Sequence, residues 1–128
     1  MITGVYASLI ALIFITLSIR VITYRRSKRL GLGDQGDKSL LKRMRAQANC
    51  AEYAPFGLLL MLMVELHGPA SSTLHLIGGL LLAGRLAHGY GFSASPPKMI
   101  LRQGGMMLTF ASYLVSIFFL LISEVGKY

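Results

Sequence analysis

The chain has 128 residues, of which 54% are hydrophobic and 14% are charged, with a formal net charge of +8. Soluble domains carry about a quarter charged residues, so this composition excludes an ordinary soluble domain and indicates a membrane protein. Nine of the thirteen Lys and Arg lie between Arg20 and Arg45. Because basic residues gathered in one loop region are typical of the cytoplasmic side of a membrane protein, we attribute the charge mainly to topology. A specific anionic partner is the alternative.

The first predicted element is a membrane helix over residues 2–24. Its Ile2–Ile19 segment has no charged residue and is long enough to cross a bilayer at about 1.5 Å per residue. The basic run that follows, up to Arg29, is expected to hold this end in the cytoplasm. Gly31–Asp37 contains glycines and aspartates and is predicted to be a loop.

The second predicted helix covers residues 39–67, and Asp37 or Ser39 is its expected cap. From Ala46 to Val64 the only charged residue of this helix is Glu52. Pro55 lacks a backbone donor and leaves one carbonyl of the preceding turn without a partner. A kink is therefore predicted just after the polar part of this helix.

The third and fourth predicted helices cover residues 71–90 and 102–124. Ser71 or Ser72 is the expected cap of the third helix, whose apolar run is interrupted by Arg85. The fourth starts at Arg102, and its polar side chains recur on one face, which predicts contact with other helices. These polar residues are Thr109, Tyr113 and Ser116.

Together these elements predict an all-α fold, an integral membrane four-helix bundle forming one domain over residues 1–128. The basic loops place both termini on the non-cytoplasmic side. The short loops favour a bacterial inner membrane over an internal eukaryotic one. The first segment has no basic start and no small-residue cleavage site, so we expect it to be retained as a helix.

The segment Arg45–Pro55 carries the polar motif of the chain. At helical spacing Arg45, Asn49, Glu52 and Tyr53 fall on one face. Charged side chains at membrane depth are costly, so those that persist usually face a bundle interior and mark a site. Gln47 falls on the opposite side, and its neighbour is expected to be another helix or another subunit.

The string R-A-Q-x-N-C-x-E-Y-x-P in this segment resembles the second helix of the membrane-associated proteins in eicosanoid and glutathione metabolism (MAPEG). It is most similar to the cysteinyl-leukotriene synthase and microsomal glutathione transferase branches, and the other spans match more loosely. The resemblance implies a homotrimer that binds glutathione between neighbouring subunits. It implies transfer of glutathione to lipophilic electrophiles from the membrane, with peroxidase activity towards lipid hydroperoxides as a further activity.

The resemblance also implies roles for individual residues. Arg102 matches an arginine that activates the glutathione thiol. The expected glutathione-binding residues are Arg25, Arg26, Arg45, Gln47, Asn49, Glu52, Tyr53, Arg85 and His88. The chain departs from the leukotriene synthase pattern at two tyrosine positions, which here are His88 and Phe92. The spacing before Arg102 is also about three residues longer than in that branch.

Glutathione suits this set chemically, because arginines bind carboxylates through two hydrogen bonds and a carboxylate binds an amine. Internal pairing of Glu52 with Arg45 or Arg85 is the simpler alternative, although one carboxylate cannot neutralise four arginines. No metal is expected, because no ligand spacing supports a site. Cys50 lies off the polar face and is expected to be a buried apolar side chain.

Two other functions are compatible with a small four-helix membrane protein. One is a non-catalytic lipid-binding member of the same family; the full polar motif argues against it. The other is a small multidrug exporter, which needs a carboxylate in the first helix, where this chain has none. A Glu52 surrounded by arginines would also stay ionised and carry protons poorly.

Overall fold

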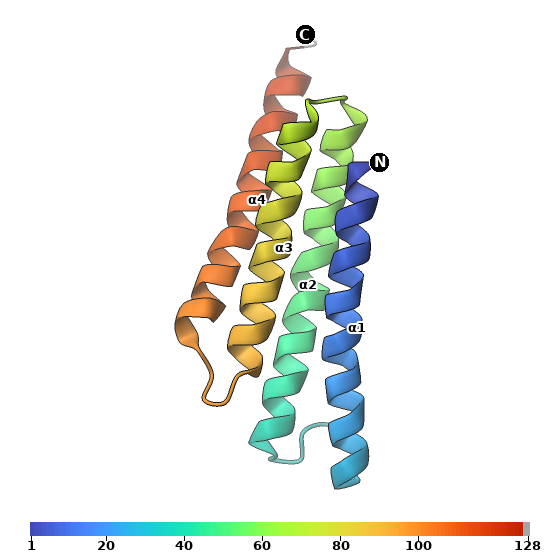
Figure 1. The fold of residues 1–128 in the computed structure, drawn as a ribbon, viewed down its shortest axis with the longest axis vertical. Coiled ribbons are helices and arrows are strands. Elements are labelled where there is room, and N and C mark those ends of the chain that lie inside the picture. The colour runs from blue at the N-terminus through green and yellow to red at the C-terminus, as the bar shows by residue number, and fades with distance from the viewer. Residues whose placement is uncertain (127–128) are drawn as a thin grey trace.

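The fold is an up-and-down bundle of four helices in a computed structural model that describes residues 1–126 (Figure 1). The helices are α1 (Ile2–Lys28), α2 (Lys38–Leu66), α3 (Ser71–Ser93) and α4 (Met99–Val125). The start of α1 and the end of α4 lie at one end of the bundle (Figure 1). The α1–α2 and α3–α4 loops, with their basic residues, lie at the other end (Figure 1), which we call the basic end.

The first two helices begin and end at local capping contacts. α1 continues past the expected end at residue 24, and Arg29 terminates it in the left-handed conformation with its amide bonded to carbonyls of the last turn. The Asp37 side chain accepts a hydrogen bond from the Leu40 amide at 2.9 Å and caps α2, as the sequence predicted. α2 runs as a single helix through Pro55.

The last two helices differ more from expectation. The expected serine cap of α3 is wrong, because Ala70 occupies the cap position and makes no side-chain hydrogen bond. α3 continues to Ser93, past the expected end at residue 90, and α4 begins at Met99, before the expected start at residue 102. The extra turns shorten the connecting loop and bring Arg102 into the first turn of α4.

Glycines allow α3 and α4 to pack closely along the bundle. A Cβ atom placed on Gly105 would lie 2.5 Å from the His88 backbone nitrogen, and one on Gly84 would lie 2.8 Å from the Gly105 carbonyl oxygen. Such distances are shorter than any stable contact, so the backbones approach closely only because side chains are absent there. α2 and α3 lie between α1 and α4 (Figure 1).

Three of the described helices, α1, α2 and α4, are long and apolar enough to cross a membrane. The expected fourth span, α3, does not reach that level, since it carries Arg85 and two histidines among its apolar residues. Arg85 and His88 are buried against neighbouring helices. The fourth helix faces the bundle with its polar residues, as predicted: Thr109 and Ser116 are fully buried and Tyr113 is partly buried. Ser112, which was not predicted, is also fully buried.

Candidate functional site

A hollow of about 590 Å³ opens between α2, α3 and α4 near the basic end. We call it the α2–α4 hollow. Its volume lies within the range of small-molecule sites. Two arginines and no carboxylate of residues 1–126 line it, so its lining is cationic. The lining residues are Arg45, Asn49, Tyr53, His88, Phe92, Met99, Arg102, Gln103, Met106 and Met107.

Arg85 lies behind the hollow and joins three helices. Its side chain is 1% exposed. Nη1 donates to Asn49 Oδ1 at 2.6 Å, and Nε and Nη2 donate to Thr109 Oγ1 at 3.2 and 2.8 Å. No carboxylate of residues 1–126 forms an ion pair with this guanidinium. Arg85 therefore holds Asn49 in place and adds uncompensated positive charge behind the site.

Arg102 presents an unsatisfied donor in the hollow. Its guanidinium carbon lies 3.9 Å from the centre of the Phe92 ring, a cation–π contact. Its Nε is buried and has no hydrogen-bond partner among the described residues. The His88 ring is buried and packs beside Phe92, 5.6 Å between centroids. Buried donors in native proteins are normally paired, so this unpaired N–H is an unusual feature of the residue that lines the hollow.

The α2 motif divides between the hollow and its rim. Asn49 and Tyr53 line the hollow, and the Tyr113 hydroxyl donates to the Tyr53 carbonyl. Arg45 also lines it but remains exposed. Glu52 is exposed and forms no ion pair with Arg45 or Arg85, so the internal-pairing alternative is wrong within one protomer.

The remaining predicted residues lie away from the hollow, on α1 and α2. Gln47 Nε2 donates to Ser18 Oγ at 3.1 Å, so its neighbour is another helix, as expected. Arg25 donates to the Gly33 carbonyl at 2.7 Å and contacts the Met44 sulfur at 3.3 Å. Arg26 is exposed. None of these residues lines the α2–α4 hollow; we call their surface the α1–α2 face.

Sequence reasoning missed part of the hollow. Met99, Gln103, Met106 and Met107 line it from α4. They lie next to Arg102 or about one helical turn from it, so their spacing along α4 could have identified them as lining residues. Cys50 is 3% exposed and packs in the core, as predicted. The residues that the structure describes contain no cluster of potential metal ligands.

Comparison with known proteins gives a consistent result. Residues 3–122 match the model of the MAPEG family. The chain is 35% identical to inner membrane protein YecN of Escherichia coli K12 over 117 residues, which cover 91% of this chain and 88% of that protein. The same protein of Escherichia coli O6:H1 matches to the same extent.

Proposed function

The chain belongs to the MAPEG family, and from that premise we propose that it is a membrane-bound glutathione transferase acting on lipophilic electrophiles. The observation that carries the proposal is the cationic α2–α4 hollow, in which the Arg102 Nε has no partner among the described residues. Glutathione brings two carboxylates, an amine and a thiol. It therefore supplies the anionic groups that the lining lacks.

Each polar group of the hollow has a task in this proposal. The exposed Arg45 guanidinium binds a glutathione carboxylate through two hydrogen bonds. The side-chain oxygen of Asn49 accepts a hydrogen bond from Arg85, and its amide N–H groups donate to a peptide carbonyl of the ligand. Glu52, exposed beside the hollow, binds the glutathione amine.

Arg102 activates the thiol. A free thiol with a pKa near about 8.5 is mostly protonated at neutral pH, and a guanidinium beside the sulfur stabilises the thiolate. The thiol proton leaves to water, and the thiolate sulfur attacks the electrophilic carbon. A carbon–sulfur bond forms while the leaving group departs with its electron pair, or the new carbanion takes a proton. His88 lines the hollow near Arg102 and contacts the ligand.

The same thiolate supports reduction of lipid hydroperoxides. The sulfur attacks one peroxide oxygen, a sulfur–oxygen bond forms, and the oxygen–oxygen bond breaks to give an alcohol after protonation. A second glutathione thiol then displaces hydroxide from the sulfur, which gives water and oxidised glutathione. Glutathione is the only reductant in this sequence.

We place the complete site between subunits of a homotrimer, as the family resemblance implies. Gln47, Arg25 and Arg26 are polar but face away from the hollow of their own protomer. In the trimer the α1–α2 face of one protomer covers the hollow of the next and adds these groups to the ligand. The basic end then lies on the cytoplasmic side of the inner membrane, and both termini lie on the other side.

The test is formation of the glutathione thiolate, followed by its ultraviolet absorbance on addition of glutathione to purified protein. The wild type should give a signal at neutral pH. Arg102→Gln should give none, or require a higher pH. Lys98→Gln is the matched control, because Lys98 is an exposed cation directly before α4 that does not line the hollow.

An Arg102→Gln signal equal to that of the wild type would remove Arg102 from the activating role. Glutathione binding without turnover of any electrophile would favour the non-catalytic lipid-binding alternative. Turnover assays with a chloronitrobenzene and with a lipid hydroperoxide separate transferase from peroxidase activity.

A further inference from the structure

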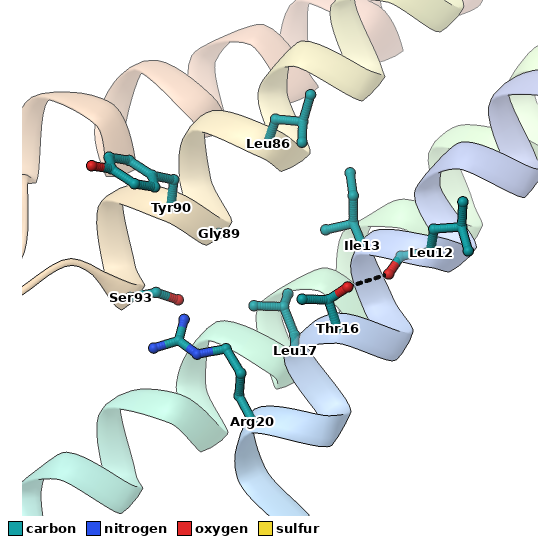
Figure 2. Close-up of a pocket in the computed structure, with 9 residues that line it drawn as sticks. All are labelled: Leu12, Ile13, Thr16, Leu17, Arg20, Leu86, Gly89, Tyr90 and Ser93. Carbon is teal, nitrogen blue, oxygen red and sulfur yellow. Dashed lines mark hydrogen bonds between the residues drawn. The ribbon is translucent and has the colours of Figure 1, made fainter.

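A second depression lies on another face of the bundle, between α1 and α3 (Figure 2). We call it the α1–α3 groove. It has a volume of about 340 Å³ and shares no lining residue with the α2–α4 hollow. Its walls are apolar and include Leu12, Ile13, Leu17 and Leu86. Figure 2 shows the Arg20 guanidinium and the Ser93 hydroxyl close together at one end.

This polar end continues into a notch towards the basic end. Arg20 lines both the groove and the notch, and Arg43 lines the notch. The Arg20 guanidinium has no hydrogen-bond or ion-pair partner among the described residues. The Ser93 hydroxyl is buried and also lacks a partner among residues 1–126. The apolar α1–α3 groove therefore ends at the Arg20 guanidinium and the Ser93 hydroxyl, neither of which has a hydrogen-bond partner among the described residues.

No carboxylate of residues 1–126 lines the notch. Asp37 accepts hydrogen bonds from the Leu40 amide and the Tyr24 hydroxyl and forms no ion pair with Arg20 or Arg43. Arg43 donates to Ser39, and its guanidinium carbon lies 4.3 Å from the centre of the Tyr24 ring. Two guanidiniums thus line one notch without an anion between them, and this positive charge suits a bound anion.

We propose that the α1–α3 groove binds an anionic phospholipid of the surrounding membrane. The acyl chain lies along the apolar walls between α1 and α3, and the phosphate lies between Arg20 and Arg43, where it accepts a hydrogen bond from Ser93. Guanidiniums bind phosphate through paired hydrogen bonds. From Leu12 to Arg20 the groove follows about 12 Å of α1, by the helical rise. This places the phosphate near the basic end, where lipid headgroups lie.

The experiment measures lipid retention by native mass spectrometry. The purified protein is equilibrated with mixed vesicles of phosphatidylglycerol and phosphatidylcholine and then transferred to detergent. The wild type should retain phosphatidylglycerol selectively. Arg20→Gln should lower the apparent affinity for phosphatidylglycerol about tenfold, as loss of a charged hydrogen-bonding group does. Lys28→Gln, which removes an exposed cation at the same end, should retain the lipid.

A second variant tests the acyl part of the groove. A Cβ atom on Gly89 would have ordinary contacts of 3.7 Å with Leu17, so the backbone tolerates a side chain there. Gly89→Leu should fill the groove and release the lipid while Arg20 remains. Unfolding midpoints of all variants, measured in the same detergent, identify any that fail to fold.

Three outcomes would overturn the proposal. Arg20→Gln could retain phosphatidylglycerol as the wild type does. Lys28→Gln could lose it equally, which would make the effect one of overall charge. Tyr90→Cys, at an exposed position of the groove, could form a disulfide between protomers in membranes, which would show that another copy of the chain covers this face. The readouts do not involve glutathione, so they stand apart from the proposed function.

Discussion

Replacing Arg85 with Met and Asn49 with Leu, singly and together, tests whether the hydrogen bond between them orders the α2–α4 hollow. The bond is short, 2.6 Å from Arg85 Nη1 to Asn49 Oδ1, and the guanidinium is 1% exposed. Hydrogen bonds to buried charges contribute about 1.5–3 kcal/mol. Asn49→Leu should therefore lower the free energy of unfolding by about 2 kcal/mol, because it leaves a buried charge without its nearest acceptor.

Arg85→Met should lower the free energy of unfolding by less than the lost hydrogen bond contributes. The substitution keeps most of the side-chain volume and also removes the desolvation cost of the charge. The Thr109 hydroxyl keeps its bond to the Gly105 carbonyl, 2.9 Å, when Arg85 is gone. Once Arg85 is Met, adding Asn49→Leu should have little further effect. The coupling free energy between the two sites should be about 2 kcal/mol, roughly 30-fold in the unfolding equilibrium constant.

The assay is reversible unfolding in mixed micelles with increasing sodium dodecyl sulfate, followed by circular dichroism. Ser112→Ala combined with Asn49→Leu is the control pair, because Ser112 donates to the Ile77 carbonyl, a contact that Asn49 does not share. That pair should be additive. A coupling below about 0.5 kcal/mol for Arg85 and Asn49 is within ordinary additivity and would refute the ordering role.

Three further predictions follow from the packing, the α2 cap and the proposed trimer. Gly105→Ala should destabilise the bundle by about 1–3 kcal/mol because the new methyl meets the backbone of α3, whereas Gly104→Ala, which meets nothing within 4 Å, should be neutral or stabilising in the same unfolding assay. Hydrogen bonds from the Leu40 amide and from Tyr24 lower the pKa of Asp37. The stability that the Asp37 carboxylate contributes is therefore present above its unfolded pKa and is lost as pH falls through its folded pKa. In acid, the unfolding midpoint of the wild type should fall more than that of Asp37→Asn. Co-expressed Arg102→Gln and Gln47→Leu chains should regain transferase activity. A site that combines the hollow of a Gln47→Leu chain with the α1–α2 face of an Arg102→Gln chain has both residues, and random mixing produces this pairing at roughly a quarter of the interfaces. Inactivity of the mixture would place the site within one protomer.

The order of the helices was readable from the sequence, but several of their ends were not. Charge-free runs separated by basic or glycine-containing loops suffice to predict four helices. The ends depend on single backbone contacts. Arg29 adopts a left-handed conformation, and Ala70 precedes α3 without a side-chain cap. Neither event has a strong residue signal, because both residue types are common inside helices.

Helical spacing predicted a shared face for four α2 residues, and three of them, Arg45, Asn49 and Tyr53, line the hollow. At 3.6 residues per turn, Asn49 and Tyr53 are rotated to one side of Arg45, and Glu52 about 20° to the other. The hollow lies on the Asn49 side, so Glu52 is left at the rim. A sequence defines these relative rotations but not which of them faces the neighbouring helix. For the same reason, the sequence could not show that Arg85 bonds to the neutral side chains of Asn49 and Thr109 and not to Glu52.

The charge distribution links the geometry of one protomer to the proposed trimer. Arg45 and Arg102 line the hollow, Arg85 lies behind it, and none of the described carboxylates lines it. The Arg102 guanidinium stabilises a thiolate weakly if water fills the hollow, because bulk water reduces the interaction to about 1 kcal/mol at 4 Å. In the proposed trimer, a neighbouring α1–α2 face would exclude that water and add Gln47 to the ligand contacts. The same contact that completes binding therefore strengthens the electrostatic activation of the thiol, and separated protomers should lose both.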